Sequence, residues 1–544
     1  MPSLLNHIKK SAGQMAYDSY LYSWSLRGYV PERLVVRPVD QWAGESERGA
    51  TLCAGELPEA YKGRGAALHD FVFLRDLRAY AYTSGQAKMV RAQARAMINS
   101  WIFSHGQRWE QDAWNLGVCG QRCALWISHY EFFSKLDDDF DAGMDDEDFQ
   151  DIFLESLAMQ GAHLSSAFMR DDEDLVGLDA LFAIQGLLYV GLAFEGYEKY
   201  VDQALMYLKE QLNTQFFGDG GHKTRSPVVL LRALSVLLDI RGALQAGGYP
   251  QPVILGEVIE RAAQAVSFFR YTDKSFAGFN GGYEYDPQLI DAVISQAACK
   301  GRSVKSLAQS GYEKIQVGRT SIMFDVGRTP SAPYDDCCHA APLAFEMCYG
   351  RERVFVNCGT HISSHEWADA LRATPAHSSL TLSDRNACEF YGEGQFDRRA
   401  TKVQSVRNEQ PGSGVLEATH NGYEGLNGFV HRRRIAIADN GYDVRGEDIL
   451  TSHMMPAEAL DVAIRFHLHP RVMVSLIRGG EEALIRMPGG AGWRFHFSGG
   501  SMALQDSVYL GDGLNVRKTK QLVISGKFLD KKCRISWVMR KEGA

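Results

Sequence analysis

The stretch KIQVGRTSIMFDVG, residues 314–327, decides the class of fold, because its apolar side chains recur at alternate positions on both sides of a Gly-Arg turn. A period of two is typical of a β-strand, and two such runs joined by a short turn predict an antiparallel pair. Similar runs follow to the end of the chain, with turn residues at intervals of about eight to twelve positions, which predicts an antiparallel β-sandwich. These runs are RVFVNCG, SSLTLSD, RRRIAIAD, GYDVRGED, VAIRFHLHP, WRFHFSGG and KQLVISGKF.

The residues before this stretch have a different period. Between about residues 64 and 300 the apolar side chains recur at helical spacing, in segments separated by links that contain Gly, Pro and Asp. Consecutive helices with short links predict a bundle, a solenoid or a toroid. We therefore predict a multidomain protein, α then β, with an α-helical domain over residues 1–305 and an antiparallel β-sandwich over residues 306–544.

The composition limits the class of partner. A net charge of −8 gives no general attraction for nucleic acid, and we expect no nucleic-acid partner. We also expect no membrane span, because no apolar run is long enough. The N-terminal stretch lacks the apolar core of a signal peptide, and the ten cysteines are scattered as in a reduced protein. These features predict a cytoplasmic location.

Short motifs occur in a fixed order along the chain. They are Asp219-Gly220-Gly221-His222 with Arg225-Ser226-Pro227, His339 with the following AFEM, Val356-Asn357-Cys358-Gly359, RATPAH at Arg372–His377, Val430-His431-Arg432-Arg433, and RFHLHP at Arg465–Pro470. Each motif alone has little specificity. Together with the order of helical domain and sandwich, they resemble the heparinase II/III family of polysaccharide lyases.

The resemblance implies an incomplete (α/α) toroid followed by a β-sandwich, with a sugar-binding cleft between them. It also implies β-elimination of acidic, uronate-containing polysaccharides. In that reaction a base removes the C5 proton while a cation, an amide or a protonated side chain neutralises the adjoining carboxylate. The expected partner is an acidic glycan, and we expect neither a metal nor another cofactor. The family's activity makes the cell envelope or periplasm an alternative location.

The loop GDGGHKTRSPVVLL, residues 218–231, places a histidine and two cations just before a predicted helix, where an anion can bind. We predict catalytic roles for His222 and Arg225, and a substrate-binding role for Lys223. The alternative is a tight glycine turn with Ser226 as the helix cap and with solvated charges. A phosphate loop is excluded, because a histidine interrupts the Gly-Lys pair of that motif.

His339 matches the family's catalytic histidine and is our strongest catalytic candidate. The adjacent Cys337 and Cys338 allow a metal or redox site instead, but no second ligand pair lies at a diagnostic spacing. The other alternative is an ordinary histidine of the sandwich. Further substrate-binding candidates are Arg372, His377 and Tyr334, although His377 could equally hydrogen-bond a neighbouring loop.

Three positions depart from the family's pattern. Val229 stands where the active lyases carry a tyrosine, Asp179 lies where they carry an Asn-His pair, and Ala341 replaces an acidic residue. If the chain is a lyase, Tyr334, Tyr312, Tyr283 and Tyr285 are the candidates to replace the missing tyrosine, and Arg225 or Arg372 could neutralise the carboxylate.

Two main hypotheses follow from these departures. One is a polysaccharide lyase, with His339 as base or acid and with Arg225 and His222 on the carboxylate. The other is a catalytically altered or inactive relative that binds an anionic glycan or an envelope precursor. A third possibility, a glycoside hydrolase, needs two facing carboxylates, for which Asp179 and Glu346 are candidates.

Overall fold

A computed structural model of the protein describes residues 20–543, apart from 63–67, 107–108, 137–145, 171–174, 300, 302–303 and 392–394. The prediction about a signal peptide concerns the N-terminal residues, of which 1–19 lie outside the described part. The chain divides into two compact units, Met1–Gln215 with Arg232–Ile259 and Phe216–Leu231 with Glu260–Ala544. It therefore passes from one unit to the other three times.

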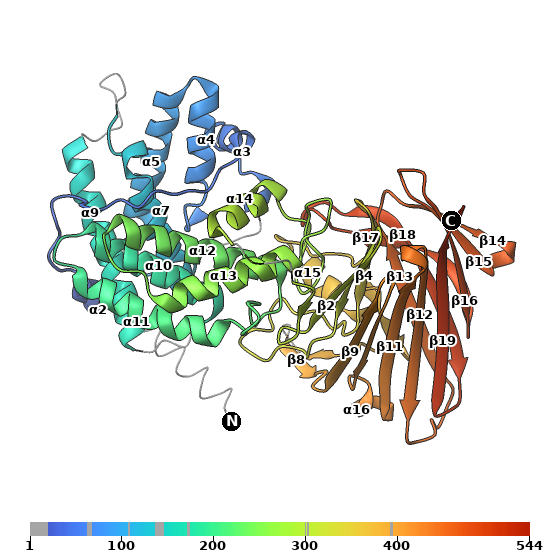
Figure 1. The fold of residues 1–544 in the computed structure, drawn as a ribbon. Helices are drawn as coiled ribbons and strands as arrows, with labels where there is room; N and C mark the ends of the chain where they lie inside the picture. The colour runs from blue at the N-terminus through green and yellow to red at the C-terminus, as the bar shows by residue number, and fades with distance from the viewer. Residues whose placement is uncertain are drawn as a thin grey trace. The chain divides into compact units, whose positions relative to one another are not determined.

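The first unit is built from α-helices that follow one another along the chain (Figure 1). Helices α12 and α13 each continue from one unit into the other, whereas α14, Pro287–Ala297, belongs to the second unit. The helices before α14 are α2 (Tyr20–Ser25), α3 (Ser46–Cys53), α4 (Leu74–Ser84), α5 (Ala87–His105), α6 (Gln111–Trp114), α7 (Leu116–Ser128), α8 (Tyr130–Phe133), α9 (Asp146–Met169), α10 (Gly177–Ala193), α11 (Glu198–Gln215), α12 (Pro227–Ala246) and α13 (Val253–Phe268).

Helices α7 and α10 illustrate how the first unit packs. Helix α10 is buried along most of its length, as expected for a helix that is apolar on all sides. A Cβ atom added to Gly186 of α10 would lie 2.4 Å from the Cα atom of Gly120 in α7. Because neither position carries a side chain, the two helix backbones can pack directly against each other.

The second unit contains two large antiparallel sheets within the described residues (Figure 1). The nine-stranded sheet has the order β1-β2-β3-β4-β5-β13-β18-β17, and β6 pairs with β13. Its strands are β1 (Ser306–Leu307), β2 (Tyr312–Val317), β3 (Thr320–Asp325), β4 (Phe345–Tyr349), β5 (Glu352–Val356), β6 (Leu380–Leu382), β13 (Leu460–Leu468), β17 (Ser501–Tyr509) and β18 (Arg517–Phe528).

The second large sheet has eight strands in the described part, in the order β14-β15-β16-β19-β12-β11-β10-β9. Its strands are β9 (Val403–Gln410), β10 (Ser413–His420), β11 (Phe429–Ala438), β12 (Asp443–Ser452), β14 (Met473–Ile477), β15 (Glu482–Arg486), β16 (Gly492–Ser498) and β19 (Lys532–Lys541). The smaller elements are β7 (Glu389–Tyr391), which pairs with β8 (Gln395–Arg398), and the helices α15 (His365–Arg372) and α16 (Glu424–Asn427).

The two large sheets share one apolar core. The ring of Phe345 in β4 stacks on Trp537 in β19, with centroids 5.8 Å apart, and Trp537 also stacks on Phe495 in β16 at 5.9 Å. Strands β2 and β3 form the antiparallel pair predicted from residues 314–327, with Ile315 opposite Ile322. The predicted fold class, helices followed by an antiparallel β-sandwich, is therefore confirmed.

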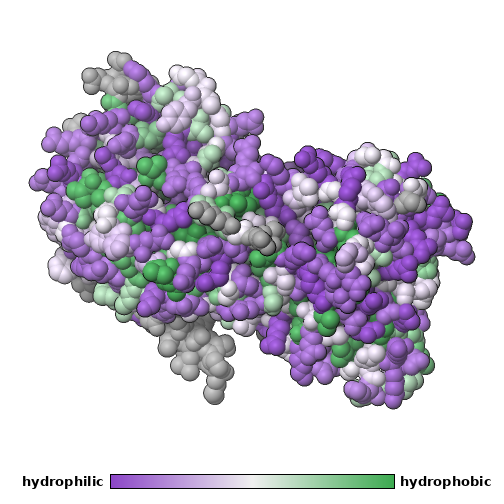
Figure 2. All heavy atoms as spheres, viewed as in Figure 1, coloured by the Kyte–Doolittle hydropathy of each residue, from purple (hydrophilic) through white to green (hydrophobic). Residues whose placement is uncertain are grey.

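The surface is mostly polar on the face that Figure 2 draws, where apolar residues form small, separate patches. Scattered exposed apolar side chains are normal on a folded protein. None of the helices between residues 20 and 543 that the structure describes is long and apolar enough to cross a membrane.

Candidate functional site

His222 lies in the loop between α11 and α12. The loop turns at Gly220, whose φ is 88°, and a Cβ atom there would lie 2.1 Å from the carbonyl oxygen of Arg261. His222 is buried, and its Nδ1 accepts a hydrogen bond from the backbone N–H of Thr224 at 3.2 Å. Burial, assisted by the charge of Lys223, lowers the pKa of His222 to about 3. The imidazole is therefore neutral near pH 7.

Arg225 has a backbone φ of 59°, in the left-handed region that is uncommon for residues with a side chain. Its buried guanidinium donates to the carbonyl oxygens of Ser310, Gly311 and Arg328 at 2.7, 3.1 and 3.2 Å. It also forms an ion pair with Asp325 at the end of β3. The predicted catalytic cation is thus held by partners inside the second unit.

His339 is buried in the connection from β3 to β4. The backbone N–H groups of Asn280 and Gly281 point at its Nδ1 and Nε2 atoms, at 3.1 and 2.8 Å. A neutral imidazole has only one ring nitrogen with a free lone pair, so only one of these two hydrogen bonds can form at a time. The loop at Asn280 and Gly281 therefore already occupies the one acceptor of this ring. Burial, followed by the electrostatic effects of the neighbouring His377 and Arg372, holds the pKa of His339 well below its usual value.

Arg372 and His377 flank a short turn that follows α15. The guanidinium of Arg372 donates to the backbone carbonyl oxygens of Cys338 and Asp335, each at 2.9 Å. Nε2 of His377 lies 3.0 Å from the carbonyl oxygen of Leu371, to which it donates, while its buried Nδ1 has no hydrogen-bond partner among the described residues. Burial, with a smaller effect of a neighbouring histidine, lowers the pKa of His377 to about 3.

Lys223 and Tyr334 are only partly buried, unlike the other predicted site residues. The ammonium group of Lys223 lies 4.0 Å from the centre of the Phe217 ring, a cation–π distance. The ring of Tyr334 meets the ring of His222 edge-on, with centroids 6.0 Å apart. Both side chains are therefore partly accessible, and Tyr334 lies against the buried ring of His222.

Contacts within the second unit connect the buried candidates. The hydroxyl of Tyr312 donates to the carbonyl oxygen of Arg225 at 2.7 Å, and the side-chain amide of Asn280 donates to that hydroxyl at 2.5 Å. Asn280 contacts His339, whose ring centroid lies 4.4 Å from that of His377. Arg225, His339 and His377 are therefore joined through Tyr312 and Asn280.

Sequence reasoning missed two members of this network. Asp325 closes an alternating strand run, and Asn280 precedes a pair of glycines, so the local sequence indicates only a strand end and a turn. Tyr312 is one of the candidates to replace the missing tyrosine. It is fully buried, and burial raises its pKa well above the usual value.

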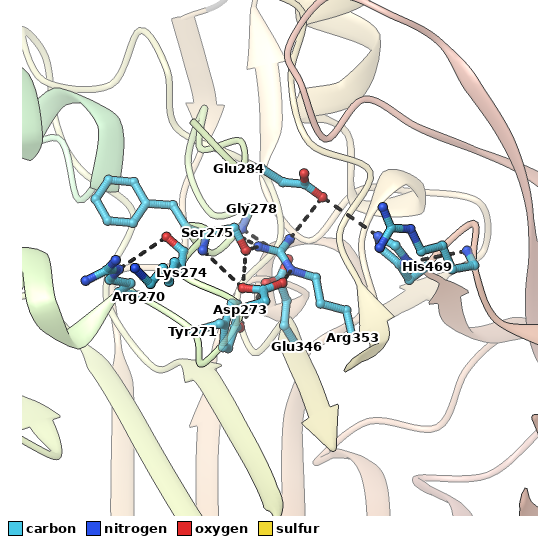
Figure 3. Close-up of polar contacts among 12 residues, drawn as sticks. Arg270, Tyr271, Asp273, Lys274, Ser275, Gly278, Glu284, Glu346, Arg353 and His469 are labelled. Atoms are coloured by element: carbon cyan, nitrogen blue, oxygen red, sulfur yellow. Dashed lines mark hydrogen bonds and ion pairs between the residues drawn. The ribbon is translucent and has the colours of Figure 1, made fainter. Parts of the chain in front are cut away.

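Glu346 belongs to a second, adjoining polar cluster (Figure 3). Its Oε1 accepts the backbone N–H groups of Gly278 and Asn357 at 3.1 and 3.0 Å, and its Oε2 accepts the hydroxyl of Tyr271 at 2.9 Å. Burial raises the pKa of Glu346, although Arg353 opposes that shift. Both oxygens of this carboxylate are thus engaged in holding the segment before α14 against β4 and β5.

Arg353 lies at the centre of the same cluster (Figure 3). Its guanidinium donates to Asp273 at 3.2 Å, to the hydroxyl of Tyr509 at 3.0 Å and to the carbonyl oxygen of Phe276 at 2.7 Å. The Tyr509 hydroxyl donates to Glu284 at 2.7 Å. Buried side chains of the nine-stranded sheet therefore fix residues 270–286 at several points.

The cysteines beside His339 do not belong to a recognisable metal cluster. Cys338 is buried, and burial raises the pKa of both Cys337 and Cys338, so both are thiols near neutral pH. Among the residues that the structure describes, no group of three or more His, Cys, Asp and Glu side chains is arranged to hold a metal ion.

Comparison with known proteins agrees with the fold. A crystal structure of heparinase III superimposes with a TM-score of 0.71 at 14% identity, covering 87% of this chain and 77% of that one. The heparan sulfate lyase HepC from Pedobacter heparinus gives 0.60 at 15% identity, covering 99% and 90%. At such low identity these matches show the fold alone. An (α/α) toroid followed by an antiparallel β-sandwich is the scaffold of polysaccharide lyases of this type.

The sequence itself matches the same family. Residues 65–300 match the family described as heparinase II/III N-terminus, and residues 300–538 match heparinase II/III-like, C-terminal. The chain therefore belongs to the heparinase II/III-like family. It is also 29% identical over 491 residues to FtsZ-localized protein C of Caulobacter vibrioides, covering 87% of this chain and 81% of that protein.

Proposed function

We propose that this protein is a catalytically altered relative of the polysaccharide lyases, which binds an acidic glycan or an envelope precursor without cleaving it by β-elimination. The observation that carries this proposal is the internal engagement of its basic groups. Arg225 is paired with Asp325, Arg372 binds two backbone carbonyl oxygens, and the ring of His339 contacts the loop at Asn280 and Gly281.

Elimination makes two demands that these groups meet poorly. The carboxylate neutraliser must contact the substrate, yet Arg225 is buried and already has an anionic partner. The base must reach the C5 proton, yet Val229 stands where the active lyases carry a tyrosine. The partly exposed side chains of Lys223 and Tyr334 would contact the glycan, and His222, His339 and His377 would maintain the shape of the site.

A polysaccharide lyase is the second candidate function. One atom favours it: Nδ1 of His377 is unprotonated and has no partner among the described residues. A neutral imidazole beside His339 is able to accept a proton. In this alternative His377 and His339 would serve the elimination together.

The relative from Caulobacter vibrioides is named for its localisation with FtsZ. We propose that this protein shares that localisation, and that its glycan ligand is accordingly a component or precursor of the cell envelope. A fluorescent fusion should follow labelled FtsZ in dividing cells of the source organism. An even distribution of the fusion protein, independent of the position of FtsZ, would refute this part of the proposal.

The reaction is tested with a panel of uronate-containing glycans and envelope precursors. Elimination creates an unsaturated uronate that absorbs ultraviolet light, and active heparinase III provides the positive control on its own substrate. We expect no such absorbance and measurable binding to at least one glycan. Absorbance that disappears in a folded His339→Gln or His377→Gln variant would establish the lyase and overturn the binding proposal. No binding to any glycan would also overturn it.

A further inference from the structure

Five arginines project from the outer face of the eight-stranded sheet, away from the apolar core. Their exposed side-chain fractions range from 41% to 62%, while their immediate neighbours in sequence on the inner face are mostly buried. We call this surface the arginine face. Its members are Arg432 and Arg434 in β11, Arg445 in β12, and Arg534 and Arg540 in β19.

The arginine face contains fewer carboxylates than guanidinium groups. Glu417 pairs with Arg432 and Arg434 at 3.5 and 3.9 Å. Glu447 likewise pairs with two arginines, Arg432 and Arg534. Each of these two carboxylates thus forms ion pairs with two arginines.

The same sharing occurs at the far end of the face, where Asp443 pairs with Arg445 and Arg540 at 2.8 and 3.0 Å. Five guanidinium groups therefore surround three carboxylates, an excess of two positive charges on a protein whose net charge is −8. Each guanidinium carries five N–H donors, and shared ion pairs leave several of them available to an incoming anion.

A hollow of about 320 Å³ lies within this face. At its centre, Ser536 in β19 pairs with Glu447 in β12 on one side and with Ser498 in β16 on the other. Because both serine side chains are small, the surface is recessed at this point. Long arginine side chains rim it. The lining residues are Arg434, Arg445, Gly446, Glu447, His496, Phe497, Ser498, Arg534, Ser536, Trp537 and Val538.

We propose that the arginine face binds an acidic peptide segment of a partner protein. Guanidinium groups match carboxylates in geometry and charge, and the serines offer hydroxyl groups to a peptide backbone. The carboxylates Glu417, Glu447 and Asp443 lie among the arginines and argue against a uniformly charged polyanion as the ligand. A nucleic acid or sulfated glycan would bring anions against them, whereas a peptide with spaced carboxylates fits between them. This surface is separate from the His339 network.

The probe for this proposal is a fluorescent peptide of alternating glutamate and serine, measured by anisotropy at low salt with the full chain. We expect binding that weakens as salt is added. The double variant Arg434→Glu/Arg534→Glu should weaken binding on the order of tenfold. The matched control, Lys520→Glu/Lys527→Glu on strand β18, makes the same charge change at exposed lysines and should leave the affinity within about twofold.

A second variant tests whether peptide binding becomes stronger when a negative charge is removed from the arginine face and all five arginines are kept. Glu447→Gln removes the central carboxylate while preserving its size, and it should strengthen peptide binding several-fold. An unchanged or weaker affinity would overturn the proposal. So would equal weakening by the two double variants, or a heparan sulfate oligosaccharide that binds this face in preference to the peptide. Failure of glycan binding at Lys223 and Tyr334 would leave these results unaffected.

Discussion

Arg225 and Asp325 form a buried ion pair although one hundred positions separate them in the sequence. Arg225 comes from the loop ahead of α12, and Asp325 closes β3. Because both charges are shielded from water, each depends on the other for compensation. The pair thus fastens the loop that carries His222 and Lys223 to the nine-stranded sheet.

Removal of one member of this pair should be strongly destabilising. We expect Arg225→Met to lower the free energy of unfolding by about 3–5 kcal/mol, because the buried carboxyl group of Asp325 would lose its cationic partner. The measurement is urea denaturation followed by a signal from the second unit. Lys520→Met, which removes an exposed partner of Asp506, provides the control and should leave the midpoint unchanged. A small effect of Arg225→Met would show that water reaches the pair.

Stability should fall as the solution is acidified. Burial lowers the pKa of His377 from 6.5 to about 3, so between these pH values the unfolded chain binds a proton that the folded chain excludes. The stabilisation is complete above about pH 6.5 and is lost toward pH 3, at up to about 1.4 kcal/mol per pH unit for one histidine.

His377→Gln should flatten this dependence, as measured by urea midpoints over that pH range. The exposed His365 provides a matched control, since His365→Gln should leave the slope as it is. Equal slopes for the natural protein and His377→Gln would contradict the assignment of a neutral, buried ring.

Gly327 leaves the space that the Arg225 guanidinium fills. A Cβ atom at position 327 would lie 2.3 Å from the guanidinium carbon, and four partners prevent that group from moving aside. We expect Gly327→Ala to lower the melting temperature, with a loss of about 1–3 kcal/mol from overpacking. Gly28→Ala, which meets no atom within 4 Å, should leave it unchanged.

Glycan affinity should depend on the partly exposed Lys223 and not on the buried imidazole of His339. Lys223→Gln removes a cation from the partly exposed loop and should weaken binding several-fold, whereas a folded His339→Gln variant should bind nearly as well as the natural protein. Isothermal titration with the glycan identified in the panel measures both. The reverse order of effects would assign the contact to His339.

Most of the architecture could be predicted from the period of the apolar residues. The spacing of apolar residues changes from helical to alternating at residues 314–327, and this change correctly separates helices from strands. A period near 3.6 places apolar side chains on one face of a helix, whereas a period of two places them on one face of a strand. The close approach of α7 and α10 at Gly120 and Gly186 could not be predicted, since a glycine in a helix does not indicate which backbone it meets.

The candidate site could be predicted only as a set of residue types. His222, Arg225, His339 and His377 were found from motifs, but their environment depends on pairings over long sequence separations. The contact of His339 with Asn280 is an example, because nothing local to either residue specifies it. The catalytic assignments stay predictions, which the panel of uronate-containing glycans tests.

The three passages of the chain between its units affect how the protein is made. Synthesis proceeds from the N-terminus, so Arg225 leaves the ribosome one hundred residues before Asp325. Until β2 and β3 have been synthesised, the loop at residues 216–226 lacks its strand partners, although the helices α11 and α12 on either side of it are made earlier. The second unit must therefore fold around residues 216–231, which are synthesised well before its strands. A fragment that starts at residue 306 would lack this segment.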